Sequence, residues 1–237
     1  MKKVISVVVA IGLFVSPVFS KSWSEAEVDK LADKVVIIFA STAENEWQGS
    51  GVFIDTKGTI LTAAHVVENP NITELVAVTT NGFLYKCEVL ACDSLRDLAL
   101  IRIAESAQKF SKAVLAKDEQ LFSGQDVLVI GHPHGWYWTV TKGIITRVFF
   151  SFPNFSYRAD TDAVINPGNS GGPVFNSRSE LIGVVSALRT TWAGYPIGIG
   201  IFVPLSEINH FLSKHLYELH KPYPKPRYRI GDLNAII

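Results

Sequence analysis

The feature that most constrains the fold is a series of short apolar runs separated by turn residues. The clearest runs lie at residues 35–40, 51–54, 59–62, 75–78, 98–103, 127–130, 143–148 and 181–185. Turn-forming sequences such as Asp55-Thr-Lys-Gly58 and Asn81-Gly82 separate them. Many short apolar runs bounded by turns predict an all-β domain whose strands close into barrels or a sandwich.

Helix is expected only near the two ends of this domain. Ser24 is a good N-cap residue, and the acidic and apolar residues that follow it predict a short capped helix. Ser206 precedes an apolar stripe at helical spacing, which predicts a C-terminal helix packed on the body of the protein. The stripe consists of Ile208, Phe211, Leu212, Leu216 and Leu219.

The first twenty residues read as an export signal, and they set the predicted domain boundaries. Lys2 and Lys3 precede an apolar run over residues 4–15 that is short for a membrane span, and Val18-Phe-Ser20 is a plausible cleavage site. We therefore expect a signal peptide at 1–20, one folded domain at 21–221 and a Pro-rich basic tail at 222–237. The chain is then periplasmic or secreted. An uncleaved N-terminal anchor is the alternative, and only that case would bring the domain to a membrane.

Composition gives no sign of a nucleic-acid-binding protein, and the cysteine spacing argues against a disulfide. Residues are 48% hydrophobic and 19% charged with a formal net charge of zero, which fits a globular domain and gives no sign of a nucleic-acid partner. Cys87 and Cys92 fall in one expected strand at an odd spacing. Their side chains should point to opposite faces, so no mutual disulfide is expected and both are interpreted as small buried residues.

The strongest chemical signal is Pro-Gly-Asn-Ser-Gly-Gly-Pro at residues 167–173. A serine hydroxyl needs a base to become nucleophilic, and the oxyanion that its attack creates needs preorganised donors such as backbone N–H groups. The glycines around Ser170 allow such a turn. Taken alone, a serine among glycines would be better explained as a structural turn, and the other motifs of the chain count against that interpretation.

A histidine and an aspartate upstream could complete a catalytic constellation. His65 stands at the end of an apolar run, where an imidazole can be half buried and still reachable, although a lone histidine is more often structural. Asp97 opens the run at 98–103, and its carboxylate there needs a hydrogen-bond partner. Asp93 and Asp162 are rival candidates, and order and spacing favour Asp97.

Four motifs together resemble the HtrA/Deg branch of trypsin-like serine proteases. They are Gly-Ser-Gly-Val-Phe-Ile-Asp at 49–55, Ile-Leu-Thr-Ala-Ala-His-Val-Val at 60–67, Asp-Leu-Ala-Leu at 97–100 and Asn-Pro-Gly-Asn-Ser-Gly-Gly-Pro at 166–173. The resemblance covers about residues 35–210 and implies two packed six-stranded antiparallel β-barrels of the chymotrypsin type. It also implies serine endopeptidase activity on unfolded or exposed polypeptide, without a cofactor or metal.

The resemblance assigns a role to individual residues. His65 would be the general base, Asp97 its orienting partner and Ser170 the nucleophile, with the backbone N–H groups of Gly168 and Ser170 forming the oxyanion hole. Ser186 would support Asp97 in a segment that pairs with substrate. The remaining expected pocket residues are apolar, which predicts cleavage after small or aliphatic residues, with Phe202 biasing the choice toward smaller ones. These residues are Val164, Ile165, Leu188, Gly200 and Ile201.

The chain also departs from the family pattern. About thirty residues follow the expected barrels, so the chain is expected to be an HtrA-type protease domain without the PDZ domains of that branch, and a homo-oligomer stays possible. His132 and His134 have no nearby carboxylate or thiol that would make them a metal site.

Two other functions stay open. Gly168-x-Ser170-x-Gly172 also fits the nucleophile turn of α/β-hydrolases, which would make the chain an esterase, but that fold needs a helix after the serine. The third candidate is a catalytically silent protease fold that binds peptides.

Overall fold

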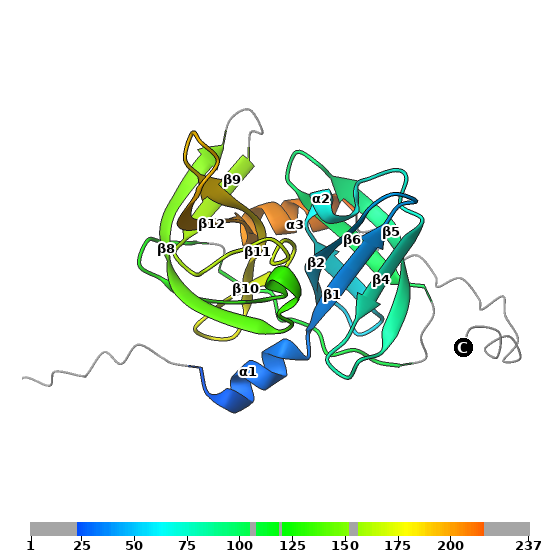
Figure 1. Cartoon of the computed structure of the whole chain (residues 1–237). Coiled ribbons are helices and arrows are strands. Elements are labelled where there is room, and N and C mark those ends of the chain that lie inside the picture. The colour runs from blue at the N-terminus through cyan, green and yellow to red at the C-terminus, as the bar shows by residue number, and fades with distance from the viewer. Residues whose placement is uncertain (1–22, 105–107, 119, 152–155, 216–237) are drawn as a thin grey trace, which may run out of the picture.

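The computed structural model describes residues 23–104, 108–118, 120–151 and 156–215. Two closed antiparallel barrels of six strands each lie side by side in it (Figure 1). The strand order is β1-β2-β3-β6-β5-β4 in the first barrel and β10-β11-β12-β9-β8-β7 in the second. This confirms the all-β, two-barrel expectation. The predicted signal peptide and the predicted tail lie outside the described residues.

Each barrel is formed by consecutive strands of the chain. The first barrel contains β1 (Val35–Ser41), β2 (Glu46–Phe53), β3 (Thr59–Thr62), β4 (Glu74–Val78), β5 (Leu84–Asp93) and β6 (Leu98–Ile103). The second contains β7 (Asp126–Gly131), β8 (Thr139–Ser151), β9 (Ser156–Thr161), β10 (Pro173–Asn176), β11 (Leu181–Thr190) and β12 (Pro196–Pro204). Short helices accompany them: α1 (Glu25–Ala32), α2 (Ala64–Val67), the 3₁₀ turn η1 (Pro133–Gly135) and α3 (Leu205–Lys214).

The predicted apolar runs lie in strands, apart from Ile54 just beyond β2, but none of the runs falls in β5, β9, β10 or β12. β9 carries Arg158 and Asp160 inside the barrel wall, and β12 begins with exposed residues and contains two glycines. The tertiary structure buries Arg158, Asp160 and Gly200 but leaves Gly198 exposed, so the local apolar pattern does not identify the two strands.

Two apolar cores hold the molecule together. One core, around Ile38, Phe53 and Ile101, fills the first barrel. The other runs from the junction between the barrels into the second barrel and includes Leu61, Phe175 and Val184. Each fully buried aliphatic or aromatic side chain stabilises the fold by about 1.5–3 kcal/mol relative to its exposed state. Because the second core crosses the junction, the two barrels are fixed relative to each other.

The predicted N-terminal helix is α1. Ser24 Oγ accepts a hydrogen bond from Glu27 N (3.3 Å), and a Glu27 carboxylate oxygen accepts one from Ser24 N (2.9 Å), which forms a capping box. Leu31 is buried in the core that joins the barrels. No helix in the described ranges has the length and apolar character needed to cross a membrane.

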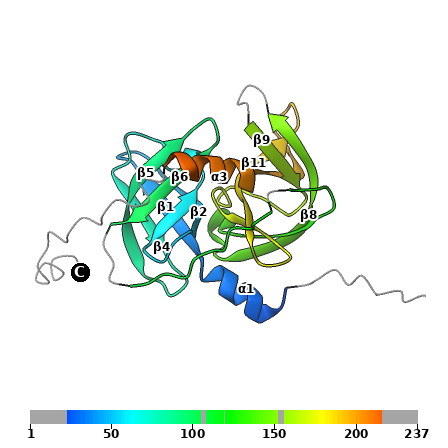
Figure 2. The same ribbon diagram turned by 180° about the vertical axis from the view of Figure 1, so that it is seen from behind.

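The C-terminal helix α3 crosses the junction of the barrels on the back of the molecule (Figure 2). It buries Leu205, Ile208 and Phe211 in the core of the second barrel. The helix follows Pro204, so Ser206 lies in its first turn. Leu216 and Leu219 of the predicted stripe lie outside the described residues.

The cysteine interpretation is half right. Cys87 and Cys92 both lie on β5 and are free thiols. Cys87 is partly buried, and burial raises the pKa of its thiol to about 12. Cys92 is exposed, contrary to the expectation of two buried residues.

Candidate active site

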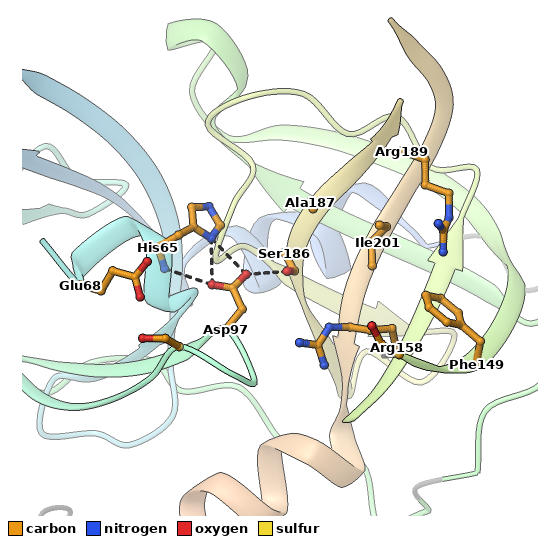
Figure 3. A pocket seen from close by; sticks show the side chains of 11 residues that line it. His65, Glu68, Asp97, Phe149, Arg158, Ser186, Ala187, Arg189 and Ile201 are labelled. Atoms are coloured by element: carbon orange, nitrogen blue, oxygen red, sulfur yellow. Dashed lines mark hydrogen bonds and ion pairs between the residues drawn. The ribbon is translucent and has the colours of Figure 1, made fainter. Parts of the chain in front are cut away.

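His65 and Asp97 face each other at the front of the first barrel. His65 lies on the single turn of α2 directly after β3, and Asp97 ends the turn between β5 and β6. Nδ1 of His65 lies 2.9 Å from Oδ1 of Asp97 and 3.1 Å from Oδ2. The backbone N–H of His65 also donates to Oδ1 (3.1 Å). The carboxylate therefore fixes the ring so that Nε2 is directed away from Asp97 (Figure 3).

This pairing changes the acidity of the imidazole. The hydrogen bond to Asp97 raises the pKa of His65 above its ordinary value of 6.5, and partial burial opposes that rise. A histidine with a raised pKa stabilises the folded chain at pH values below about 6.5, and this contribution is lost as the pH rises through the raised value. At higher pH the ring is neutral, and Nε2 can accept a proton.

Asp97 is held in an uncommon backbone conformation by the second barrel. Its φ is 56°, in the left-handed region that costs a typical non-glycine residue about 1–2 kcal/mol. Ser186 on β11 donates its hydroxyl to Oδ2 of Asp97 (2.5 Å). A residue of one barrel thus orients the carboxylate of the other.

Arg158 on β9 is a second support that crosses from barrel to barrel. The residue is 5% exposed. Its guanidinium donates to four neutral acceptors on the two barrels, namely Ser156 Oγ and the carbonyl oxygens of Tyr157, Leu95 and Arg96. Leu95 and Arg96 directly precede Asp97, so Arg158 fixes the turn from which that carboxylate projects. Sequence reasoning missed this residue.

The rival carboxylates are engaged elsewhere. Asp93 accepts from the backbone N–H of Arg96 (3.0 Å) and from its guanidinium (2.9 Å). The same guanidinium also pairs with Glu207 of α3 at 3.0 Å. Asp162 accepts from the backbone N–H of Ile144 at 2.7 Å. Of the three aspartates, Asp97 is the one that meets His65.

The turn before Ser170 presents two backbone donors. Asn169 N bonds to Asn166 O (3.0 Å), and Gly168 between them has φ +102°, where a side chain would strain the backbone. The Pro167 carbonyl accepts from His134 N (3.0 Å), and the Asn169 carbonyl accepts from Gly172 N (2.9 Å). In a trans peptide the N–H points opposite to the C=O, so the N–H groups of Gly168 and Ser170 point away from these bonds. Neither has an acceptor within the described part of the chain.

Buried polar contacts fix this turn from behind. Ser50 of β2 donates its hydroxyl to Gly168 O (2.7 Å) and lies 2.9 Å from Nδ1 of His132. Since the hydroxyl has one proton, His132 is the donor in the second bond. Burial lowers the pKa of His132 to about 3, so its ring is neutral near pH 7. The side chain of Gln48 donates to the His132 carbonyl.

Ser170 lies between the two barrels at the tip of this turn. Its carbonyl accepts from Ser50 N at 2.7 Å. Its Oγ has no hydrogen-bond partner among the residues that the structure describes, and His65 Nε2 is therefore not yet bonded to it. Catalytic hydrogen bonds are often long in ligand-free enzymes and tighten when substrate binds.

The expected primary pocket is shallow. A Cβ on Gly200 would lie 2.3 Å from Cγ1 of Ile165, so the Ile165 side chain already occupies the space above Gly200. Leu188 pairs with Gly200 across the ladder and therefore shares its face. Phe202 is fully buried with its ring against Gly183, so it does not line an open pocket. Val164 is exposed at 59%.

Ile201 does not belong to that pocket, which corrects the sequence assignment. Neighbouring strand residues point to opposite faces, so Ile201 and its partner Ala187 face away from Gly200 and Leu188. They line a separate cavity of about 600 Å³ between the barrels. His65 and Asp97 lie at one end of this cavity, and Phe149 and Arg189 lie at the other (Figure 3).

The arrangement as a whole combines an imidazole, a carboxylate bonded to it, a hydroxyl and two backbone N–H groups without an acceptor in the described part of the chain. Within the described ranges, no group of three or more His, Cys, Asp or Glu side chains could hold a metal ion. Helix does not follow Ser170: the next element is β10, and the fold consists of antiparallel barrels, so the α/β-hydrolase alternative is wrong.

Comparisons with known proteins agree with this fold. The family model described as a trypsin-like peptidase domain matches residues 49–184. A DegP-like periplasmic serine endoprotease of Buchnera aphidicola is 35% identical over 71% of this chain and 36% of its own length. Serine protease HhoA of Synechocystis sp. is 36% identical over 68% of this chain and 41% of its own length. The chain thus spans well under half the length of these curated relatives.

Solved structures give the same result. A serine endoprotease from Yersinia pestis superposes with a TM-score of 0.70 at 28% identity, covering 83% of this chain and 68% of the other. The HtrA-type protease AlgW, solved with a tripeptide, has a TM-score of 0.70 at 26% identity, covering 81% and 64%.

Proposed function

This chain belongs to the trypsin-like peptidase domain family, and from that premise we propose that it is a serine endopeptidase acting on unfolded or exposed polypeptide segments. One observation carries the proposal. The turn of Ser170 packs against Thr62 and Ala63, just before His65, and the N–H groups of Gly168 and Ser170 have no acceptor among the described residues. Its relatives are named serine endoproteases.

The proposed reaction proceeds through an acyl-enzyme. Ser170 Oγ attacks the substrate carbonyl carbon while His65 Nε2 takes the hydroxyl proton, and the oxyanion is bound by Gly168 N–H and Ser170 N–H. The C–N bond then breaks as His65 returns its proton to the leaving amine. Water, deprotonated by His65, attacks the ester carbonyl, and the C–Oγ bond breaks as His65 returns the proton to Ser170. Asp97 stabilises the imidazolium that forms in each half of the reaction.

The shallow recess beside Ile165 supports selection of the residue before the scissile bond. Its exposed lining is aliphatic, and a lysine or arginine there would bury a charge without a partner, at a cost of several kcal/mol. A valine or alanine would fit and lose apolar surface to the recess. We therefore expect cleavage after Val, Ala, Ile, Leu or Thr, with the smaller residues preferred.

Location and partners follow from the same relatives. Several of them are named periplasmic endoproteases, and the N-terminal segment has the composition of a signal peptide. We infer an exported protein whose partner is a polypeptide substrate.

The alternative is a silent peptide-binding module, and it is favoured by one observation: Ser170 Oγ has no hydrogen-bond partner among the described residues. One experiment separates this alternative from an active protease. Purified protein is incubated with casein, with and without a serine-directed phosphonate. Phosphonate-sensitive degradation supports the proposal. Intact casein in the presence of a folded chain that still binds peptide would support the silent module.

A further inference from the structure

The cavity between the barrels has two ends of opposite charge. At the first-barrel end lie His65, Asp97 and Glu68. At the other end, Phe149 and Ile201 form an apolar floor beside Arg189 (Figure 3). The cavity is separate from the shallow recess beside Ile165, because Ile201 and Ala187 point to the opposite face of their strands.

The second-barrel wall of this cavity carries more positive than negative charge. Asp160 is 3% exposed, and its Oδ2 is shared by Arg147 (2.9 Å) and Arg189 (2.9 Å). Nearby, Arg158 bonds only to carbonyl and hydroxyl oxygens among the described residues. Two guanidiniums therefore share a single carboxylate at the Arg189 end, whereas Arg158 lies within electrostatic reach of Asp97 and Glu207.

Arg189 holds its guanidinium where a ligand could meet it. The group lies over the ring of Phe149, with Cζ 4.8 Å from the ring centroid, and Arg147 stacks on the same ring at 4.4 Å. The Arg189 side chain is 28% exposed, while its Nη2 is buried without a hydrogen-bond partner in the described part of the chain. Stacking fixes the plane of the guanidinium, so a carboxylate that reaches it finds an ordered donor.

Strand geometry places a particular substrate residue at this end. An extended substrate that pairs with residues 186–188 alternates its side chains between two faces. If the residue before the scissile bond enters the recess beside Ile165, the second and fourth residues before that bond face the cavity. The second meets His65. The fourth lies about 7 Å farther along, toward Phe149 and Arg189.

We propose that the Arg189 end of the cavity is a subsite for an acidic side chain at the fourth residue before the scissile bond. The methylene groups of a glutamate would lie on Phe149 and Ile201, and its carboxylate would pair with Arg189. An acidic side chain at the second position would instead meet Glu68 and Asp97, so the preference is specific to position. This inference rests on the proposed function for its substrate direction.

The test uses internally quenched peptides with alanine before the scissile bond and Glu, Gln or Lys at the fourth position. We expect kcat/KM for the Glu peptide to exceed that for the Gln peptide about tenfold, with Lys lowest. In Arg189→Gln the Glu and Gln peptides should be cleaved at equal rates, and in Arg189→Lys the preference for Glu should persist. Arg178→Gln removes an exposed arginine outside the cavity and should leave the preference intact.

Binding keeps the inference separate from catalysis. In Ser170→Ala, fluorescence anisotropy should give a Kd about tenfold lower for the Glu peptide than for the Gln peptide, with the difference lost at 1 M salt, roughly where the screening length falls to 3 Å. Moving Glu to the second position should abolish the gain. Failure to cleave any peptide would refute the proposed function while this binding difference still stood. Equal affinity for Glu and Gln, or a preference that survives in Arg189→Gln, would overturn the subsite.

Discussion

The two barrels share a topology but differ in what they bury. In the first barrel the fully buried polar side chains are hydroxyls and one arginine, Arg102. The second barrel with α3 buries ionisable groups of both signs, namely His132, Arg158, Asp160 and Glu207. The first barrel presents His65 and Asp97 from short segments at its edge, and Ser186 and Arg158 in strands of the second barrel hold that pair. The turn of Ser170 belongs to the second barrel and is held in part by Ser50 of the first, so each barrel supports the site residues of the other.

The largest expected effect comes from the nucleophile. Ser170→Ala should lower kcat by about a millionfold, as expected when a triad serine is removed. Thermal unfolding should stay nearly unchanged, because Oγ makes no hydrogen bond within the described part of the chain. Casein degradation and calorimetry measure both. Ser213→Ala, an exposed serine on α3, is the control, and full activity of Ser170→Ala would remove the serine from its role.

Removing the carboxylate of the first barrel should have the next largest effect. Asp97→Asn should lower kcat about ten-thousandfold, because the imidazole loses the group that sets its tautomer. It also removes the main cause of the raised pKa of His65, so the acid limb of kcat/KM should move to lower pH.

In the unmodified chain the activity should rise with pH through an inflection above 6.5. A pH-independent rate between about pH 5 and 8 would contradict His65 as the base.

Arg158 tests whether the second barrel supports the first. Arg158→Met should lower kcat about a hundredfold with little change in KM. Without the guanidinium, the turn at Leu95 and Arg96 is released and Asp97 shifts away from its position beside His65. The inflection of the pH profile should fall as well, since the His65–Asp97 bond loosens. Arg178→Met serves as control for the loss of an arginine from the same barrel. A variant that loses stability but keeps its pH profile would give Arg158 a structural role only.

The smallest effect concerns the recess of the second barrel. Ile165→Ala should clear the space above Gly200 and raise cleavage after Leu or Phe relative to Ala by about tenfold, the usual scale for adding space for a few methylene groups. Cut sites in casein, mapped by mass spectrometry, report the change. In the unmodified chain a majority of cuts after Lys or Arg would refute the assignment of this recess.

The difference between the barrels also explains what the sequence could predict. The site residues of the first barrel follow local motifs: His65 comes just after one apolar strand and Asp97 just before another, and the structure brings the two together. The supports of the second barrel stand inside strands without such a motif. Arg158 and Asp160 lie two residues apart on β9, and only the closed barrel shows that both are buried. The charged pair two residues apart in Tyr-Arg-Ala-Asp-Thr, at 157–161, was the available signal.

Pocket residues were harder to predict for a related reason. The sequence places Gly200 and Ile201 next to each other, but the strand turns their side chains to opposite faces. Separating the two residues therefore required knowing that they lie on β12, a strand that the apolar pattern did not identify. The cavity between the barrels was not predicted for the same reason, because Ile201 of β12 lines it.

The central claim is that Ser170 is a nucleophile activated by His65 across the junction of the barrels. Reaction of the purified chain with a serine-directed phosphonate, followed by intact mass measurement and peptide mapping, tests it most directly. The account predicts one adduct per chain, on Ser170, formed faster as the pH rises through the pKa of His65 and formed far more slowly in Asp97→Asn. A folded chain that forms no adduct, or carries it on another residue, would contradict the claim.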